Sequence, residues 1–142
     1  MTPLECVRKV IECDNARDIA GYRALLHDDY TARVHGKPQT DGAQQEAAAL
    51  EAWWAATPDS HLEELATHVD GHWVTLRYAL SGTNQGPLAG QPPTGKAFQT
   101  EACTIFEILD GRVQRTFRFA DTLGMLTQLG LTGLTGPTKS SD

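Results

Sequence analysis

The sequence is short of basic residues and of long apolar stretches. Its 12 lysines and arginines stand against 18 aspartates and glutamates, which gives a formal charge of −6. Non-specific affinity for nucleic acid comes from Lys and Arg on phosphate, and anionic membrane surfaces attract basic segments. We therefore expect no nucleic-acid partner and no membrane partner. No apolar stretch approaches the roughly 18 residues that a membrane-spanning helix needs.

Cysteine is also scarce. The three cysteines are an odd number, which does not suit a disulfide framework. Cys6 and Cys13 lie on one expected helix, about 10 Å apart along its axis and beyond disulfide reach. The N-terminus shows no apolar h-region of a secretory signal. We therefore expect reduced core thiols and a cytoplasmic location.

Motifs of common metal and cofactor sites are missing. None of the five histidines has a spacing such as His-Glu-x-x-His, so we expect no metal site and no cofactor. The Gly/Pro-rich loop 82–96 lacks the Gly-Lys-Ser/Thr ending of a phosphate loop. This loop is interpreted either as a lid over a pocket or as a plain connection between strands.

What is present suits one domain. The chain has 142 residues, of which 40% are hydrophobic, enough for a single core. We expect this domain to cover residues 1–130. Residues 131–142 have a turn-rich composition and are predicted to form a mobile tail.

Helical periodicity dominates the first part of the chain. Thr2, Pro3 and Glu5 form a capping-box start, followed by apolar residues at helical spacing. A second helix follows Asp18, and a third covers about 43–56, where it stops before a proline.

From residue 61 the apolar period changes to two. The predicted strands cover 30–35, 61–69, 72–81, 97–109 and 112–121, with a loop at 36–42 and a short helix at 122–130. Asp70-Gly71 and Asp110-Gly111 are hairpin turns. This order predicts an α+β fold, in which a cone-shaped, curved antiparallel sheet packs on about three N-terminal helices and encloses an internal pocket.

The most informative carboxylate ends the last strand. Uninterrupted alternation along 112–121 places Arg115, Phe117 and Asp121 on the more apolar face, which we expect to line the interior. A buried carboxylate has a raised pKa, which suits general acid–base catalysis near neutral pH. The alternative is that Asp121 only caps the helix that follows.

Four ordered motifs carry a family resemblance. They are Gly82-Thr-Asn-Gln-Gly86, Pro92-Pro-Thr-Gly95, Asp110-Gly111 and the segment from Asp121 to Gly130. Over residues 4–130 the sequence resembles the SnoaL-like polyketide cyclases, within the nuclear-transport-factor-2-like fold that includes ketosteroid isomerase and limonene epoxide hydrolase.

The resemblance implies a cofactor-free cone that holds a small hydrophobic molecule. It also implies intramolecular aldol closure of a polyketide ester, with the aspartate at the end of the last long strand as acid/base, the position of Asp121. Arg115, Arg33 or His35 would stabilise the oxyanion. Trp54 and Phe117 would line the pocket, with Trp54 at its floor. The sequence departs from the family pattern at Arg33, Arg115 and Phe117.

Two other functions stay open. Relatives in the fold isomerise ketones, hydrolyse epoxides or assist hydroxylation. The fold also serves binding modules without catalysis, because fold alone does not determine function. Since an open sheet needs covering, we also expect a homodimer or a higher homo-oligomer.

Overall fold

The computed structural model describes residues 1–131; the rest of the predicted tail, from residue 132, lies outside the described residues. The helices are α1 (Pro3–Ala16), α2 (Ile19–Ala24), α3 (Ala43–Ala56) and α4 (Thr122–Gln128). The strands are β1 (Leu26–Val34), β2 (Lys37–Asp41), β3 (His61–Asp70), β4 (Trp73–Thr83), β5 (Ala97–Leu109) and β6 (Arg112–Ala120).

Helix α1 begins, and helix α3 ends, where the sequence predicts. The Glu5 backbone N–H donates to Thr2 Oγ1 at 3.1 Å, and the Thr2 N–H donates to Glu5 Oε1 at 2.9 Å. This confirms the capping box. Helix α3 stops at Thr57, whose backbone leaves the helical region before Pro58.

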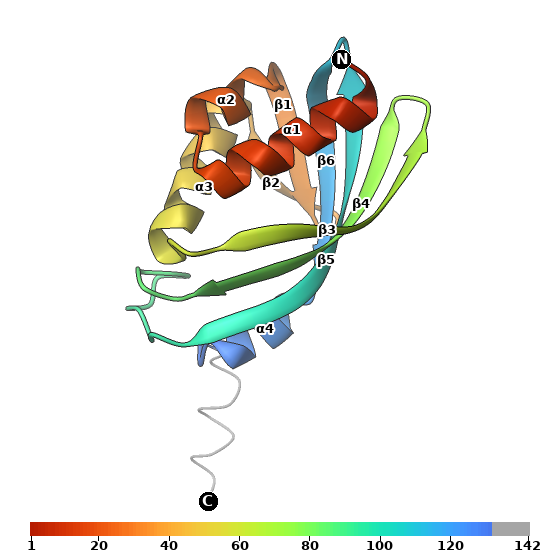
Figure 1. Cartoon of the computed structure of the whole chain (residues 1–142). Coiled ribbons are helices and arrows are strands. Elements are labelled where there is room, and N and C mark those ends of the chain that lie inside the picture. Colours follow the sequence, from red (N-terminus) through yellow and green to blue (C-terminus); the bar gives the residue numbers. More distant parts are fainter. Residues whose placement is uncertain (132–142) are drawn as a thin grey trace, which may run out of the picture.

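The strands form one bent sheet in the order β2-β1-β6-β5-β4-β3. Strand β1 runs parallel to β6, and all other neighbours are antiparallel. The sheet is not closed, and α1, α2 and α3 lie on its concave side (Figure 1). The predicted α+β architecture with a curved sheet and a short terminal helix is confirmed, and the parallel β1–β6 pair is an addition to it.

Strand β2 lies in the segment 36–42 that the sequence predicts as a loop. It pairs with β1 through a two-residue turn, His35-Gly36, in which both residues have positive φ (50° and 80°). Such turns usually carry Asn-Gly or Asp-Gly, so the hairpin signal was absent. Pro38 is tolerated because β2 is an edge strand.

One extra residue in β6 decides which of its side chains face the helices. Ile108 of β5 pairs with Val113, whereas its neighbour Glu107 pairs with Arg115, so Gln114 forms a β-bulge without an opposite residue. Successive side chains of a strand point to opposite faces, so one inserted residue moves every later side chain to the other face.

Beyond the bulge, the prediction of which β6 side chains face inward is therefore wrong. Thr116 is buried, and Arg118 lies against Glu46 of α3 on the concave side. Arg115, Phe117 and Asp121 instead lie on the convex side or at its edge. Uninterrupted alternation predicted that these residues face inward. That prediction followed the apolar side chains of Phe117 and Phe119, and the bulge turns their side of β6 outward.

The hydrophobic core fills the space between the helices and the concave face. The apolar stripe of α1 packs there with Tyr22 of α2 and with the inward residues of β4 and β5. Burial raises the pKa of the Cys6 thiol to about 11. All three cysteines are free; Cys6 is buried as predicted, and Cys13 and Cys103 are half-buried.

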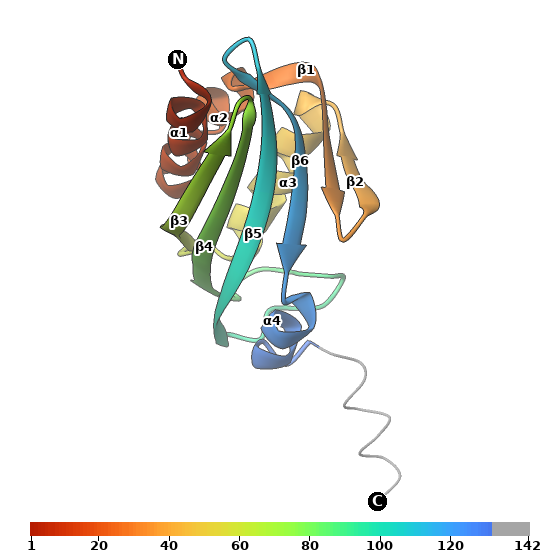
Figure 2. The ribbon, with the colours of Figure 1, turned by 90° about the vertical axis from the view of Figure 1, so that its right-hand side faces the viewer.

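Among residues 1–131, no helix covers the middle of the convex face. Figure 2 views this face, with β5 and β6 in front and α3 behind them. Helix α4 packs against β5, where Gln128 exchanges two hydrogen bonds with the Gln99 backbone (2.9 and 3.1 Å). Within residues 1–131, no helix is both long and apolar enough to cross a bilayer.

Candidate active site

A small cavity lies between the helices and the concave face of the sheet. Its volume is about 70 Å³, and side chains from α1, α2 and β3 to β6 line it. Most of the lining is aliphatic or aromatic. The polar members are Asp14, Tyr22, Tyr78, Thr104 and Arg118. The cavity is therefore an apolar space with a few polar groups that point into it, the usual form of a small-molecule site.

A buried ion pair of Glu46 and Arg118 forms one wall of this region. Arg118 Nη2 donates to Glu46 Oε2 at 2.7 Å. The same carboxylate accepts hydrogen bonds from the hydroxyls of Tyr22 (2.8 Å) and Thr40 (2.7 Å). Burial by itself would raise the pKa of Glu46, but the charge of Arg118 and these hydrogen bonds outweigh burial and lower the pKa. Glu46 is therefore a fixed anion.

Two buried tyrosines surround the pair as neutral groups. Burial raises the pKa of Tyr22 well above its usual value and that of Tyr30 to about 12. Arg118 donates to the Tyr30 hydroxyl at 3.3 Å and to Gln39 Oε1 at 2.6 Å. These contacts fix the guanidinium, so its charge stays beside the cavity.

Asp14 is a second carboxyl group at the cavity. It lies near the end of α1, half-buried, and its Oδ1 accepts a hydrogen bond from Trp54 Nε1 at 2.9 Å. Burial raises the pKa of Asp14, although the Trp54 hydrogen bond and the charges of Arg17 and Arg118 act in the opposite direction. The two carboxyl groups near Arg118 thus have pKa values shifted in opposite directions.

Asp121 lies outside the cavity. It is exposed, and its Oδ1 accepts a hydrogen bond from the Gly124 backbone N–H at 2.9 Å, which caps α4. This geometry bears out the capping role that was the alternative for this residue. The predicted burial of Asp121 among aromatic rings is wrong, because the bulge at Gln114 precedes it.

The predicted oxyanion-stabilising residues also lie away from the cavity. Arg115 is exposed, and its Nε lies 2.6 Å from Glu107 Oε1. Arg33 donates to the Gly36 carbonyl at 2.8 Å in the β1–β2 turn. The exposed His35 contacts the Ala120 backbone, with Nε2 at 3.1 Å from the carbonyl oxygen.

Phe117 and Trp54, the two aromatic residues predicted to line the pocket, lie in different parts of the structure. Phe117 is half-buried and packs on Trp73, with ring centroids 6.4 Å apart, on the convex side. Trp54 contacts the side chain of a cavity residue, through its hydrogen bond to Asp14. None of the predicted site residues is among those that line the cavity, and Trp54 adjoins it through Asp14.

Sequence reasoning missed Asp14, Glu46 and Arg118. The sequence contained a signal that Asp14 and Glu46 face the interior. Asp14 continues the apolar stripe of Val7, Val10 and Ile11 at helical spacing. Glu46 lies on the same stripe as the small apolar residues of α3. A charged residue on an apolar helical stripe is buried, and a buried charge needs a partner. No such signal identified Arg118, because its orientation depends on the bulge.

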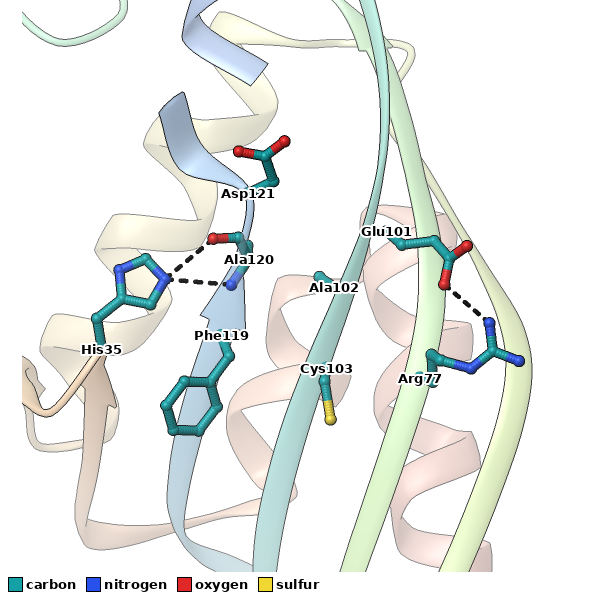
Figure 3. Close-up of a pocket in the computed structure, with 8 residues that line it drawn as sticks. All are labelled: His35, Arg77, Glu101, Ala102, Cys103, Phe119, Ala120 and Asp121. Atoms are coloured by element: carbon teal, nitrogen blue, oxygen red, sulfur yellow. Dashed lines mark hydrogen bonds and ion pairs between the residues drawn. The ribbon is translucent and has the colours of Figure 1, made fainter. Parts of the chain in front are cut away.

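A wider hollow of about 400 Å³ lies on the convex face. Figure 3 shows its lining, with His35, Phe119 and Asp121 on one side and the pair Arg77–Glu101 (2.8 Å) on the other, and with the helices behind the strands. This hollow is open to solvent, so its charges are screened and its carboxylates stay hydrated. The enclosed cavity is the better candidate for catalysis.

Within residues 1–131, no group of three or more His, Cys, Asp or Glu side chains has the arrangement of a metal site. The polar groups that converge on the cavity are carboxyl, guanidinium and hydroxyl groups. These groups can move protons and stabilise negative charge on oxygen.

The chain resembles known cyclases along most of its length. Residues 4–129 match the SnoaL-like polyketide cyclase family. The chain is 31% identical over 133 residues to the aklanonic acid methyl ester cyclase DnrD of Streptomyces peucetius, covering 91% of each chain. It is 31% identical over 107 residues to the nogalonic acid methyl ester cyclase of Streptomyces nogalater, covering 74% of this chain and 80% of that one.

A solved structure confirms the fold. The putative SnoaL-like polyketide cyclase from Jannaschia sp. CCS1 superposes with a TM-score of 0.84, at 22% identity and 92% coverage of both chains. Together with the match over residues 4–129, these similarities show that the chain belongs to the SnoaL-like polyketide cyclase family.

Proposed function

We propose that this protein is a cofactor-independent enzyme that acts on a hydrophobic carbonyl compound in the interior cavity, by acid–base catalysis. The observation that carries the proposal is the pairing, at one apolar cavity, of a fixed cation with a carboxyl group whose pKa is raised. The family relationship supports a cyclisation, since the relatives at 31% identity are named as cyclases of polyketide methyl esters.

The groups at the cavity suit the steps of an aldol closure. The reaction removes a proton next to a carbonyl group, stabilises the enolate oxygen, and returns a proton to the new alkoxide. A carboxyl group with a raised pKa can exchange the proton, and a fixed guanidinium can stabilise the oxyanion. Asp121 remains a prediction as acid/base, and its exposed position as a helix cap does not support it.

The cavity must widen to hold a polycyclic ester. Its volume is about 70 Å³, whereas sites for drug-sized ligands measure roughly 300–1,000 Å³. We expect α1 and α2 to move outward on binding, because these two short helices and the bent sheet form the cavity walls. A substrate of small volume would bind without this movement.

Hydrolysis of an epoxide is the second candidate function. It needs a carboxylate that activates water and an acid that protonates the leaving oxygen. The observation in its favour is that Asp14 and Glu46 both interact electrostatically with Arg118. Because Glu46 accepts hydrogen bonds from three side chains at 2.7–2.8 Å, it is poorly placed to activate water, and cyclisation is the better-supported function.

The test uses two probes with different product masses. Aklanonic acid methyl ester would cyclise without a change in mass and with a change in retention on chromatography. Limonene oxide would gain one water. Cyclisation supports the first function and hydration the second. Saturable binding of either probe without product would contradict both and would favour a binding module.

We also propose that the protein forms a homodimer through its convex face. Phe119, 45% exposed, and half-buried Phe117 and Trp73 lie on this face, which no helix in the described part of the chain covers. Light scattering of the wild type and of Phe119→Asp tests the proposal: the wild type should have twice the monomer mass and the variant should dissociate. A monomeric wild type would contradict it. The cytoplasmic location remains a prediction from the free thiols.

A further inference from the structure

We propose that Asp14 is the catalytic acid/base of the interior cavity and that Arg118 stabilises the substrate oxygen opposite to it. This inference rests on the proposed function, that the cavity binds a carbonyl compound. Asp14 comes from α1 and Arg118 from β6, so the helix layer and the sheet each supply one of the two groups. A substrate carbonyl held between the two layers would meet both.

Asp14 is held in one orientation. Trp54 Nε1 donates to Oδ1 at 2.9 Å, and the guanidinium of Arg17 lies over the Trp54 ring, 5.8 Å from its centroid. Arg17 is in turn anchored by the carbonyl oxygens of Pro58 and Ser60, both at 2.6 Å. This chain of contacts positions the carboxyl group before a substrate arrives, as efficient proton transfer requires.

The charges around Asp14 come from three elements. Arg17 at the C-terminal cap of α1 and Arg118 of β6 favour the carboxylate, and Glu46 of α3 disfavours it. Burial has the largest effect and raises the pKa of Asp14 overall. Tyr22 and Tyr78 also line the cavity and stay neutral, since burial raises the pKa of both. Asp14 can therefore change its protonation state closer to neutral pH than an exposed aspartate.

Glu46 is excluded as the acid/base by its own contacts. Its pKa is lowered, and its oxygens already accept hydrogen bonds from Tyr22, Thr40 and Arg118. When two carboxyl groups of one site have pKa values shifted apart, the group with the raised value transfers the proton. Glu46 instead positions Arg118 and keeps it charged.

The reaction neither gains nor loses a proton overall. The Asp14 carboxylate takes a proton from the carbon next to the ester carbonyl, and the C–H electron pair forms the enolate, whose oxygen accepts a hydrogen bond from Arg118. The enolate carbon then forms a bond to the ketone carbon of the same molecule. The resulting alkoxide takes the proton back from Asp14. The product is an isomer of the substrate, and no oxidant, reductant or second reactant is consumed.

The experiment compares Asp14→Asn with Asp121→Asn on aklanonic acid methyl ester. Both replacements are nearly isosteric, and asparagine still offers an oxygen to Trp54 at position 14 and to Gly124 at position 121. If Asp14 transfers the proton, Asp14→Asn lowers kcat by about 100-fold or more, the usual contribution of acid–base catalysis, and changes KM little. Asp121→Asn tests the competing prediction, in which the acid/base is the residue that follows β6 and kcat falls in this variant instead. Asp14→Glu should restore part of kcat with a displaced pH profile, which a purely structural role for Asp14 would not produce.

The outcomes separate this inference from the proposed function. If the wild type cyclises the ester and Asp14→Asn does too, the function stands and the role of Asp14 is overturned. A loss of activity only in Asp121→Asn overturns it as well.

If the wild type does not cyclise the ester, the proposed cyclisation fails, and a second measurement decides the role of Asp14. Carbon-detected NMR would follow the Asp14 carboxyl group, assigned with Asp14→Asn, with and without 2-naphthol, whose hydroxyl resembles an enol. A titration midpoint above the ordinary value of about 3.9, together with a shift on adding 2-naphthol, supports the inference. A midpoint at or below that value, or no response to 2-naphthol, overturns it.

Discussion

The two faces of the sheet hold ion pairs of similar length in opposite surroundings. On the concave face, Arg118 and Glu46 lie 2.7 Å apart, with side chains 25% and 4% exposed. On the convex face, Arg77 and Glu101 lie 2.8 Å apart, with side chains 53% and 62% exposed. Arg118 of the first pair lines a partly enclosed cavity, and both members of the second pair line an open hollow.

This difference shows that burial, and not the presence of charged residues, marks the candidate site. In water, unit charges at this separation attract weakly, and the attraction grows several-fold in a less polar interior. The same burial raises the pKa of Asp14 while Arg118 and hydrogen bonds hold that of Glu46 down. Of the two pairs, it is therefore the concave one that lies near a carboxyl group suited to proton transfer.

The largest expected effect comes from shifting β6 by one residue beyond the bulge. Insertion of one alanine between Arg115 and Thr116 would move every later side chain of β6 to the other face, turning Arg118 outward and Phe117 and Phe119 inward. We expect loss of the folded state, a cost above about 4 kcal/mol, measured by circular dichroism and urea unfolding. The control, Gln114→Ala, keeps the residue count and should cost less than about 1 kcal/mol, because Gln114 makes only an exposed hydrogen bond to Asp29. A stable, native-like insertion variant would contradict the dependence of the fold on this register of β6.

The next effect compares the two ion pairs directly. Arg118→Met leaves Glu46 as an unpaired buried anion and should cost about 3–5 kcal/mol, whereas Arg77→Met should cost about 0–1 kcal/mol. Urea unfolding of both variants at neutral pH checks this. The double variant Glu46→Leu/Arg118→Met should recover most of the lost stability, since no lone charge remains. Equal costs for the two single variants would show that the faces do not differ as described.

The pH dependence of stability sharpens the comparison further. The folded pKa of Glu46 lies below its ordinary value of 4.5, so its carboxylate stabilises the fold above that pH, and the contribution is lost as pH falls through the folded pKa. Unfolding free energies measured from neutral to acidic pH should fall less steeply in Glu46→Leu/Arg118→Met than in the wild type. Parallel curves would mean that the concave pair does not account for the acid sensitivity.

The smallest effect concerns Asp121 at the edge of the convex face. Asp121→Ala removes the cap of α4 and should cost about 1 kcal/mol, whereas Asp121→Asn should cost only a few tenths, because asparagine caps helices as well as aspartate does. Thermal unfolding of both variants measures the difference. A marked increase in stability for Asp121→Asn would indicate instead a carboxylate under strain, as expected of a buried acid/base.

Much of the fold could be predicted from local patterns. The capping box at Thr2, the end of α3 before Pro58 and the turn at Asp110-Gly111 lie where the sequence places them. The turn between β3 and β4 lies one residue later than predicted, at Gly71-His72. Each depends on a few neighbouring residues and so leaves a short-range signal. The β1–β2 hairpin was missed because His35-Gly36 lacks the usual turn residues.

The candidate site could be predicted far less well. Trp54 was identified and contacts Asp14, whereas Asp121, Arg115, Phe117, Arg33 and His35 were expected at the cavity and lie elsewhere. Asp14 and Glu46 occur on apolar helical stripes and could have been noticed. Arg118 could not, because its face depends on how β6 pairs with β5.

The sequence by itself therefore determined most of the elements, their order, the α+β class and the family, since propensity, capping, turn chemistry and ordered motifs are properties of nearby residues. The tertiary structure alone decided which charges are buried. In the register between β5 and β6, Gln114 has no paired residue on β5. This one extra residue turns Arg118 toward Glu46 and leaves Asp121 exposed to solvent. The bulge forms in the assembled sheet, where pairing across strands outweighs the local alternation of apolar residues.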